Sequence, residues 1–202
     1  MSGCIAKERK GDMTTQALNT TSLPHLSTRL YLDSSICATD IDEITRLLQD
    51  VVVLEDIAQV PHNYTRQDAI HLLHQLELLE QTRPDLASLK FTIRDKTNQK
   101  PVGRIDIRPD GNGWKMGYWL GLEHWGQGIM TWACSEALKA ARQHGICKVS
   151  ASPKHGNWGS RKVLERNCFR HVRDEAQYFQ FDCEMFDCWI MEVNLEDRKE
   201  HK

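Results

Sequence analysis

One stretch in the middle of the chain, residues 116–130, constrains the fold more than any other. It reads Met-Gly-Tyr-Trp-Leu-Gly-Leu-Glu-His-Trp-Gly-Gln-Gly-Ile-Met. The pattern predicts a strand over 114–120, a short polar turn, and a helix from Gly126–Gly128 to about His144. Two glycines one residue apart let the backbone approach a ligand closely, and the free amides at a helix start favour an anion. The stretch therefore predicts a phosphate group held by main-chain amides, although a Gly-x-Gly alone is a weak signal.

The bulk composition narrows the class of protein. A chain of 202 residues with 40% hydrophobic and 27% charged residues is typical of one soluble globular domain with tails. The formal net charge of −2 argues against a general nucleic-acid binder. No apolar run approaches the length of a membrane span, and residues 1–12 lack the apolar segment of a secretory signal. We therefore expect a cytoplasmic protein without nucleic-acid or membrane partners.

The cysteines favour neither a disulfide framework nor a metal site. There are seven, an odd number, and they are scattered without a Cys-x-x-Cys pair. Cys183 and Cys188 have no neighbouring Cys/His set that would complete a zinc site. We expect reduced thiols and no metal.

Hydrophobic periodicity predicts an α+β fold in three layers, with a mixed, mostly antiparallel seven-stranded sheet and about four helices. The expected strands span residues 27–32, 88–93, 102–107, 114–120, 148–152, 168–172 and 189–195. The expected helices span residues 39–49, 65–81, 126–144 and 158–167, with capping boxes at Thr39–Asp42 and Thr65–Asp68. A polar and aromatic loop is expected over 174–187.

A helix joins the strand at 114–120 to the strand at 148–152, so these two strands should be parallel neighbours at the centre of the sheet. Their splaying ends should open a cleft beside the glycine turn. Around this single domain, expected over residues 25–196, residues 1–24 should form a flexible leader and residues 197–202 a charged tail.

Three phosphate-bearing cofactors are candidates for the glycine turn. A P-loop needs Gly-Lys-Ser/Thr before its helix, and this chain has Gly128-Ile129-Met130. A dinucleotide fingerprint needs a third glycine where Thr131 stands. The third candidate is coenzyme A, held across a split parallel strand pair.

The run Gly117-Tyr-Trp-Leu, followed by Trp125-Gly-Gln-Gly-Ile, resembles the acetyl-CoA signature of the GNAT superfamily, in its RimJ/RimL-like branch of ribosomal-protein-alanine/serine acetyltransferases. A second run, Asn157-x-x-Ser160-x-x-Val-Leu-Glu-Arg-Asn-Cys-Phe169, resembles that branch's Asn-x-x-Ser-x-x-x-Leu-Glu-Lys-x-Gly-Phe element. Residues 28–32 and 61–69 are also typical of the branch, so the similarity spans about residues 27–195.

The resemblance implies acetyl-CoA as co-substrate and assigns residues to it. The pyrophosphate would be lined by Trp125, Gly126, Gln127, Gly128, Ile129 and Met130. The pantetheine arm would pair with the strand that carries Tyr118, Trp119 and Leu120. Asn157 would contact the coenzyme and Ser160 would lie near its sulfur. Spacing alone favours Asn157 as an N-cap and Ser160 as a first-turn polar residue of a short helix, whereas the two motifs together favour the coenzyme role.

The chain departs from the family pattern at three positions. Trp132 stands where relatives have Glu, and Cys168 replaces the glycine of the Gly-Phe pair, which suggests a reshaped turn. At the position of a proposed base glutamate the chain has Gln177, with Glu175 two residues earlier.

The implied reaction is acetyl transfer to a primary amine, either a protein N-terminus or a small amine, by direct attack on the thioester. A backbone amide of 117–120 would stabilise the oxyanion, and Ser160 or Tyr178 would protonate the leaving thiolate. Candidate bases are Glu175, Glu123, His124 and Asp106. The acids spread through 174–187 suit a basic or amine-bearing acceptor, and a solvated loop explains the same charges.

Two other functions stay open from the sequence. One is a non-catalytic acyl-CoA-binding sensor or scaffold on the same fold, and the other is an acidic interaction module with an accidental glycine turn. The protein is expected to be a monomer or a homodimer.

Overall fold

A computed structural model describes residues 24–55, 57, 60–61, 63–82, 89–111, 113–179 and 183–197. The expected leader lies outside the described residues except for Pro24, and the expected tail lies outside them except for Asp197.

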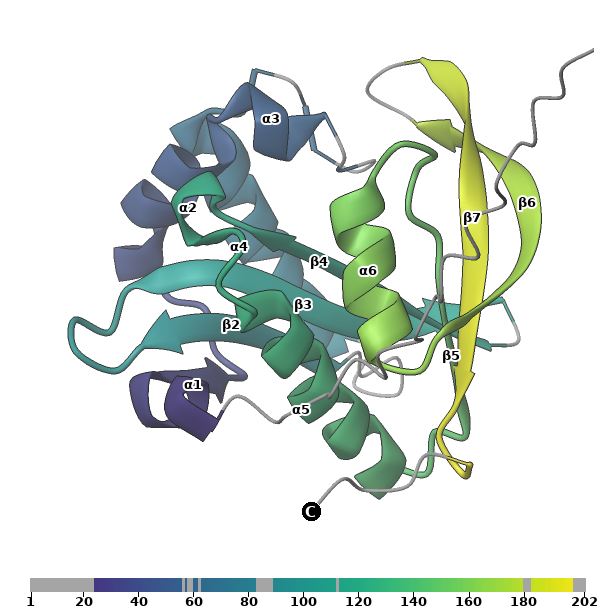
Figure 1. Cartoon of the computed structure of the whole chain (residues 1–202). Coiled ribbons are helices and arrows are strands. Elements are labelled where there is room, and N and C mark those ends of the chain that lie inside the picture. The colour runs from purple at the N-terminus through teal and green to yellow at the C-terminus, as the bar shows by residue number, and fades with distance from the viewer. Residues whose placement is uncertain are drawn as a thin grey trace, which may run out of the picture.

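The described residues form one seven-stranded mixed sheet in the order β1-β2-β3-β4-β5-β7-β6 (Figure 1). The strands are β1 (Leu30–Asp33), β2 (Leu89–Asp95), β3 (Pro101–Asp110), β4 (Gly113–Leu120), β5 (Lys148–Ala151), β6 (Arg170–Phe179) and β7 (Glu184–Asn194). Every neighbouring pair is antiparallel except β4 and β5, which are parallel. The predicted strand number and the predicted parallel pair are confirmed.

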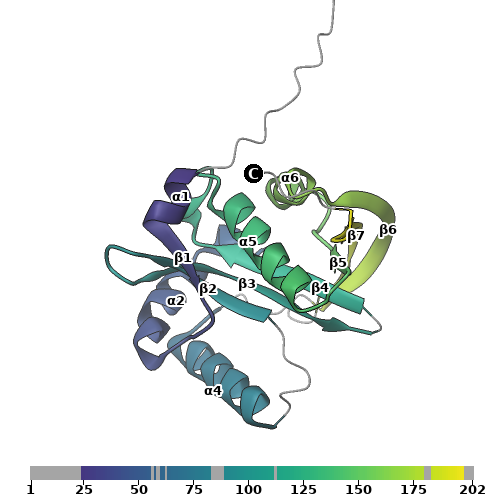
Figure 2. The same cartoon turned by 90° about the horizontal axis from the view of Figure 1, so that it is seen from below.

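Helices cover both faces of the sheet, which gives the predicted three layers. The α-helices are α1 (Pro24–Arg29), α2 (Ile41–Leu48), α3 (Val51–Leu54), α4 (Arg66–Thr82), α5 (Ile129–Gln143) and α6 (Trp158–Arg166). Figure 2 shows α1, α5 and α6 on one face and α2 and α4 on the other. The four long helices were predicted, whereas the short α1 and α3 were not.

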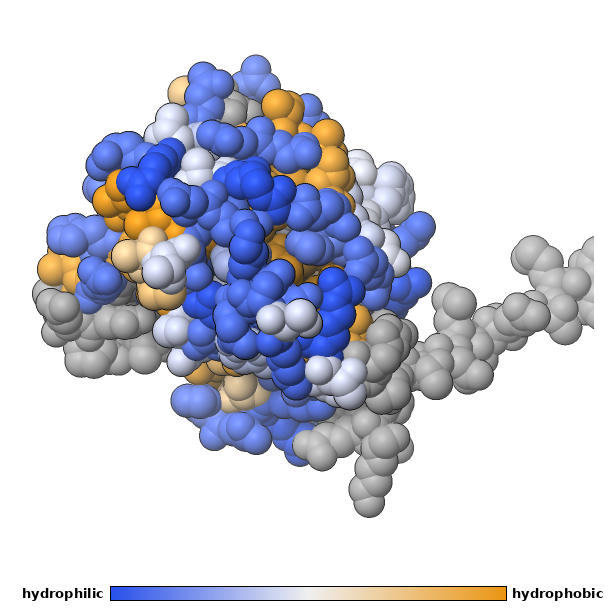
Figure 3. Space-filling model, turned by 90° about the vertical axis from the view of Figure 1, so that its left-hand side faces the viewer, coloured by the Kyte–Doolittle hydropathy of each residue, from blue (hydrophilic) through white to orange (hydrophobic). Residues whose placement is uncertain are grey.

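Each face of the sheet has its own hydrophobic core. The first core lies between the sheet and α5 and α6, and the second lies under α2 and α4. The predicted stripe of α2, namely Ile41, Ile44, Leu47 and Leu48, is fully buried. Around α2 and the turn between β2 and β3, the outer surface is mostly hydrophilic (Figure 3).

Three local predictions are corrected by the structure. The strand expected from Ser27 begins at Leu30, because residues 24–29 form α1. The capping box expected at Thr39–Asp42 is wrong: Asp40 accepts a hydrogen bond from the amide of Cys37 instead, at 2.9 Å. The box at Thr65–Asp68 is confirmed, since the Thr65 amide donates to the Asp68 carboxylate at 2.8 Å.

The loop expected over 174–187 is largely a β-hairpin. β6 and β7 pair from Asp174↔Trp189 to Phe179↔Glu184. β6 is an edge strand, and nearly all of its side chains are exposed. An edge strand with water on both faces needs no alternation of apolar and polar residues. This alternation is the pattern from which strands are predicted, and it is missing here, so a loop was expected.

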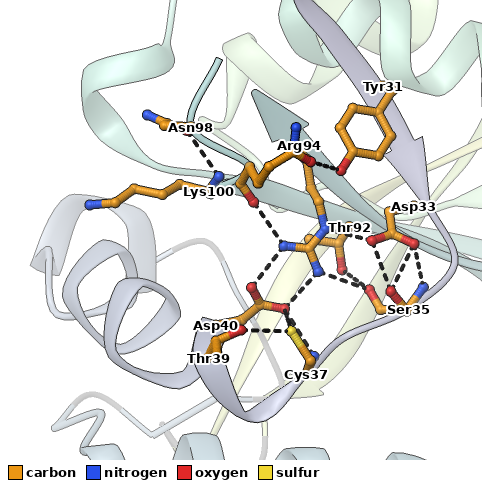
Figure 4. A network of polar contacts seen from close by, with 11 residues as sticks. Tyr31, Asp33, Ser35, Cys37, Thr39, Asp40, Thr92, Arg94, Asn98 and Lys100 are labelled. Carbon is orange, nitrogen blue, oxygen red and sulfur yellow. Dashed lines mark hydrogen bonds and ion pairs between the residues drawn. The ribbon is translucent and has the colours of Figure 1, made fainter. Parts of the chain in front are cut away.

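A buried arginine ties the first two strands to the start of α2 (Figure 4). Arg94 on β2 is 5% exposed, and its guanidinium donates to Asp33 at 2.6 Å and to both carboxylate oxygens of Asp40 at 2.7 Å. Burial alone would raise the pKa of Asp40, but the hydrogen bonds from Arg94 and the Cys37 amide outweigh it and lower that pKa. The network therefore holds two ionised carboxylates inside the fold.

Replacing Arg94 by methionine leaves these carboxylates buried without a counter-ion, which we expect to lower the free energy of unfolding by about 3–5 kcal/mol at pH 7. Urea denaturation measures this value. The exposed pair of Arg66 and Asp42 supplies the control, since Arg66→Met should cost less than about 1 kcal/mol.

The pH dependence of the Arg94→Met effect follows from the depressed pKa values of Asp33 and Asp40. The stabilisation by the Arg94 ion pairs is complete above about pH 4, the pKa of an aspartate in the unfolded chain. It is lost as the pH falls through the lower folded-state pKa values. Equal losses in the two variants, or a difference that grows in acid, would contradict this account.

Candidate active site

The parallel pair at the centre of the sheet opens almost as soon as it forms. In the described part of the chain, β4 and β5 are in register at one position, Lys115↔Ser150. β4 then continues to Leu120, whereas the chain after β5 stays with β7: the Trp189 amide donates to the Pro153 carbonyl at 3.0 Å. The predicted splay is therefore confirmed, and the β5 side of β4 lacks a strand partner beyond Lys115.

The glycine turn lies between the open end of β4 and the start of α5. Gly126 and Gly128 have φ values of 72° and 76°, in the left-handed region, and Gly128 is the N-cap of α5. The helix thus begins at Ile129, slightly later than predicted. A Cβ added at Gly126 would meet no atom within 4 Å, so this side of the turn is open. The conformation requires glycine and leaves room for a ligand against the backbone.

The side chains of the turn anchor it from within. The Trp125 indole donates to the Leu120 carbonyl at 2.8 Å, and the Gln127 amide donates to the Glu123 carbonyl at 3.0 Å. Ile129 and Met130 are buried in the first core. The turn is therefore fixed by two hydrogen bonds from partly or largely exposed side chains and by the buried Ile129 and Met130 that follow it.

Helix α2 supports this turn from the other face of the sheet. A Cβ on Gly121 would lie 2.5 Å from Leu47 Cδ2, so a larger residue there would force the Leu47 side chain to shift. Arg46 donates to the Glu123 carboxylate at 2.7 and 3.0 Å and thereby lowers the pKa of Glu123. Burial lowers the pKa of the adjacent His124. Glu123, one of the candidate bases, is thus held as an ion-paired carboxylate.

Tyr118 and Ser160 meet on the α6 face of the sheet. The Tyr118 hydroxyl lies 2.8 Å from Ser160 Oγ, and burial raises the pKa of Tyr118 well above its usual value. Asn157 caps α6, because its Oδ1 accepts from the Ser160 amide at 2.8 Å. The cap role that spacing alone allowed for Asn157 is therefore present. The hydroxyl of Ser160 is held against the strand that loses its partner.

The other predicted catalytic residues lie on β6. Glu175 is ion-paired with Arg173 at 2.6 Å, and Tyr178 is 59% exposed. Gln177 accepts from Lys115 at 3.2 Å and from Ser152 at 2.9 Å. Within the described residues, the hydrogen bonds of Ser160 lead to Tyr118 and Asn157 rather than to Glu175 or Tyr178.

On the face of the sheet toward α2 and α4, an ion pair of Asp106 and Arg108 lies beside β4. The sequence did not predict on which face this pair lies. A Cβ on Gly117 would lie 2.8 Å from Arg108 Nη1 and 3.2 Å from Asp106 Oδ1. Asp106, another candidate base, also accepts from Arg108 at 2.6 Å. Trp119, on the same face, packs against the second core. β4 therefore presents Tyr118 to α6 and presents Gly117 and Trp119 to the side of α2 and α4.

Arg29 is a further residue of this region that the motifs did not indicate. Its Nη1 lies 3.4 Å from the side-chain oxygen of Gln127, beside the glycine turn, while its Nε pairs with Asp95 at 3.1 Å. Only the fold brings it there, from a position 98 residues away in the sequence.

No group of three or more His, Cys, Asp or Glu side chains suited to a metal occurs among the described residues. None of the helices in the described part of the chain is long and apolar enough to cross a membrane.

A mixed sheet that splays at its parallel pair, with a glycine-capped helix start beside the opening, defines the class of coenzyme-A-dependent N-acetyltransferases. The family comparison agrees. The model of the acetyltransferase (GNAT) domain matches residues 29–170, so the chain belongs to this family and is an acetyltransferase. A search of curated proteins with the sequence finds no match.

Solved structures of acetyltransferases share the fold, and RimL and RimJ proteins are among them. RimL, a ribosomal L7/L12 α-N-protein acetyltransferase in complex with coenzyme A, is 18% identical, with 86% of this chain and 98% of that chain covered and a TM-score of 0.71. RimJ of Mycobacterium smegmatis is 19% identical, with 85% of this chain and 88% of that chain covered and a TM-score of 0.70. Spermidine N-acetyltransferase of Vibrio cholerae is 15% identical, with 84% of this chain and 97% of that chain covered and a TM-score of 0.66.

Cys168, which replaces the family's glycine after α6, keeps the left-handed backbone with φ 68°. That conformation costs a residue with a Cβ roughly 1–2 kcal/mol, and glycine's larger unfolded-state entropy offsets roughly half of the gain. We therefore expect Cys168→Gly to raise the free energy of unfolding by about 0.5–1 kcal/mol in urea denaturation. The exposed Cys147, whose φ is not positive, provides the control. Cys147→Gly should lower stability, and a gain in both variants would refute the strain at Cys168.

Proposed function

We propose that the protein transfers an acetyl group from acetyl-CoA to a primary amine, on a protein N-terminus or a small molecule. One observation carries the proposal: β4 loses its strand partner directly beside the glycine-capped start of α5. An unpaired strand edge offers main-chain groups to an extended amide-bearing arm, and a helix N-terminus offers amides to a pyrophosphate. Coenzyme A carries both of these groups.

The residues of the turn fit a pyrophosphate. Both glycines hold positive φ, and the space beside Gly126 is open. The amides of residues 126–130, flanked by Trp125, would hold the phosphates, and the nearby Arg29 guanidinium would add a positive charge. The edge of β4 that carries Tyr118, Trp119 and Leu120 would pair with the pantetheine arm, and Asn157 would contact it from α6.

In the proposed reaction, the amine lone pair attacks the thioester carbonyl, the carbon–sulfur bond breaks, and the thiolate takes up a proton. A preorganised amide of 117–120 stabilises the oxyanion, an effect typically worth roughly 3–4 kcal/mol. Ser160 supplies the proton or hydrogen bond to sulfur, because Tyr118 holds its hydroxyl beside this strand. Tyr178, our alternative proton donor, lies exposed on the edge strand.

The amine must lose a proton before or during attack. An α-amine with a pKa of about 7.7–8.0 is partly neutral at physiological pH, whereas a lysine with a pKa of about 10.4 is not. Glu175 would serve as base after leaving Arg173, an exposed ion pair worth roughly 0–1 kcal/mol. Asp106, beside Gly117, would have to leave Arg108.

A non-catalytic acyl-CoA sensor or scaffold is the second candidate. The observation that favours it is that three candidate bases, Glu123, Glu175 and Asp106, are each engaged by an arginine. Such a protein would bind the coenzyme at the same turn without transferring its acetyl group.

Coenzyme binding is tested by Gly128→Val against Gly145→Val. Both glycines have a φ of 76°, so both substitutions impose similar backbone strain, but Gly145 lies at the far end of α5. Acetyl-CoA at about 100 times its Kd should stabilise the wild-type protein and Gly145→Val by about 2.7 kcal/mol. Gly128→Val should lose this stabilisation in a thermal-shift titration. Retained stabilisation in Gly128→Val would place the phosphate site elsewhere.

Catalysis is tested by Ser160→Ala, with acetylation followed by mass spectrometry over a panel of peptide N-termini and small amines. We expect kcat to fall roughly 100-fold, while the Kd of acetyl-CoA changes little. Tyr118→Phe should lower kcat less and should not add fully to Ser160→Ala, since the two hydroxyls act together. The exposed Ser34→Ala is the control. No acetylation by the wild-type protein, with coenzyme bound, would favour the sensor.

A further inference from the structure

One cation on the face of the sheet under α2 and α4 has no ion-pair partner among the described residues, although the charges of Asp106 and Asp40 act on it. Arg104 on β3 lies directly opposite Thr92 on β2 and Trp119 on β4, so its side chain shares their face. It is half-buried, and within the described residues its guanidinium makes no hydrogen bond or ion pair. Burial lowers its pKa, whereas the pKa of Arg94 on the neighbouring strand is raised by its bonds to Asp40 and Asp33.

A hydroxyl without a partner lies in the same region. Tyr64, just before α4, is 4% exposed, and its hydroxyl is the one buried side-chain N or O atom of the described residues that has no hydrogen-bond partner. Burial raises its pKa to about 12, and the charge of the nearby Arg104 acts in the opposite direction. Both groups are hydrogen-bond donors that lack an acceptor. An anion is the kind of acceptor that both groups favour.

The nearest acid does not meet this need. Asp106, two residues along β3 from Arg104, is bound to Arg108 at 2.6 Å. A half-buried guanidinium and a buried hydroxyl without hydrogen-bond acceptors lower the stability of the free protein. Such costs are found at ligand-binding sites, where the ligand supplies the missing partner.

The position of Arg104 relative to the splay suggests which ligand this is. Lys115 is the last β4 residue in register with β5, and Gly117 and then Trp119 follow on the α2 and α4 face. Arg104 pairs with Trp119, so it lies one row, about 7 Å, beyond Gly117 toward the open end. Ser160 and Tyr118 lie on the other face. If the coenzyme occupies the strand edge and its thioester lies toward Ser160, the face of Arg104 is the one left for the acceptor.

We propose that Arg104, with the hydroxyl of Tyr64, forms an anion subsite for the acceptor, and that the acceptor is an amine that also bears a carboxylate or a phosphate. This inference rests on the proposed acetyltransferase function. An N-terminus followed by Asp or Glu, or a small amine bearing a phosphate, has this chemistry.

The acids on β6 do not oppose this assignment, although the sequence favoured a basic acceptor. Asp174 lies 2.9 Å from His171 and 3.2 Å from His155, and Glu175 is paired with Arg173. These carboxylates have partners within the protein, in contrast to Arg104.

The test compares matched acceptors that differ only in charge. Peptides beginning Ala-Glu, Ala-Gln and Ala-Lys form one arm, and phosphoethanolamine against ethanolamine forms the second, which distinguishes a peptide from a small-molecule source. With the wild-type protein, kcat/KM should be at least about 10-fold higher for the acidic member of one arm. A preference for neutral or basic acceptors in both arms overturns the proposal.

Variants then assign the preference to the subsite. Arg104→Gln should abolish the acidic preference while acetylation of the neutral acceptor changes little, and Arg104→Lys should keep part of the preference. Arg66→Gln, an exposed arginine paired with Asp42, is the control and should retain the preference. An equal loss for all acceptors in Arg104→Gln means a structural role and refutes the inference.

Tyr64→Phe separates stability from recognition. Removing a buried hydroxyl that has no partner should raise the melting temperature, and it should weaken the preference for the acidic acceptor. A higher melting temperature with unchanged acceptor selectivity removes Tyr64 from the subsite.

Binding measurements keep the two proposals distinguishable. If no acceptor is acetylated, the proposed function fails, and calorimetric titration of the Ala-Glu peptide and phosphoethanolamine in the presence of coenzyme A still tests the subsite. At least about 10-fold weaker binding to Arg104→Gln than to the wild-type protein supports the subsite. Equal binding to both proteins, or no binding to either, overturns it.

Discussion

The buried ion pairs of Arg94 with Asp33 and Asp40 are the interaction on which the arrangement of the site depends. They attach the chain between β1 and α2 to the second strand, and so fix where α2 begins. Seven residues later, Leu47 fills the space beside Gly121, and its neighbour Arg46 holds Glu123. The turn that leads into α5 is thereby positioned by a helix on the opposite face of the sheet. A charged contact far from the glycine turn thus determines the geometry of that turn.

The divergence of β4 from β5 assigns different tasks to alternate residues of one strand. Tyr118 points toward α6 and meets Ser160, whereas Gly117 and Trp119 face the side of α2, Arg108 and Arg104. Because side chains alternate along a strand, coenzyme and acceptor chemistry can be separated by the thickness of the sheet. Under the proposed function, the amine and the thioester would approach the same short segment from opposite faces.

Strong periodic patterns explain why much of this was predictable. The strand, glycine turn and helix over 114–144 were found because glycine spacing and buried alternation are local signals. α1 and α3 were missed because helices of six and four residues are too short to show a period. The part of β6 beyond residue 172 was missed because an exposed edge strand needs no apolar face. The sequence did not single out Arg104 and Arg29, because only the fold shows which strands and turns lie beside them.

The single register position shared by β4 and β5 also has a mechanical consequence. The single sheet has two halves, β1 to β4 and then β5, β7 and β6, which share one main-chain register position. Side chains join them instead, through the first core, the pair of Tyr118 and Ser160, and the contact of Lys115 with Gln177. Side-chain packing yields more readily than a hydrogen-bonded ladder. The seam that would admit the coenzyme is therefore also the line along which the two halves of the molecule can flex.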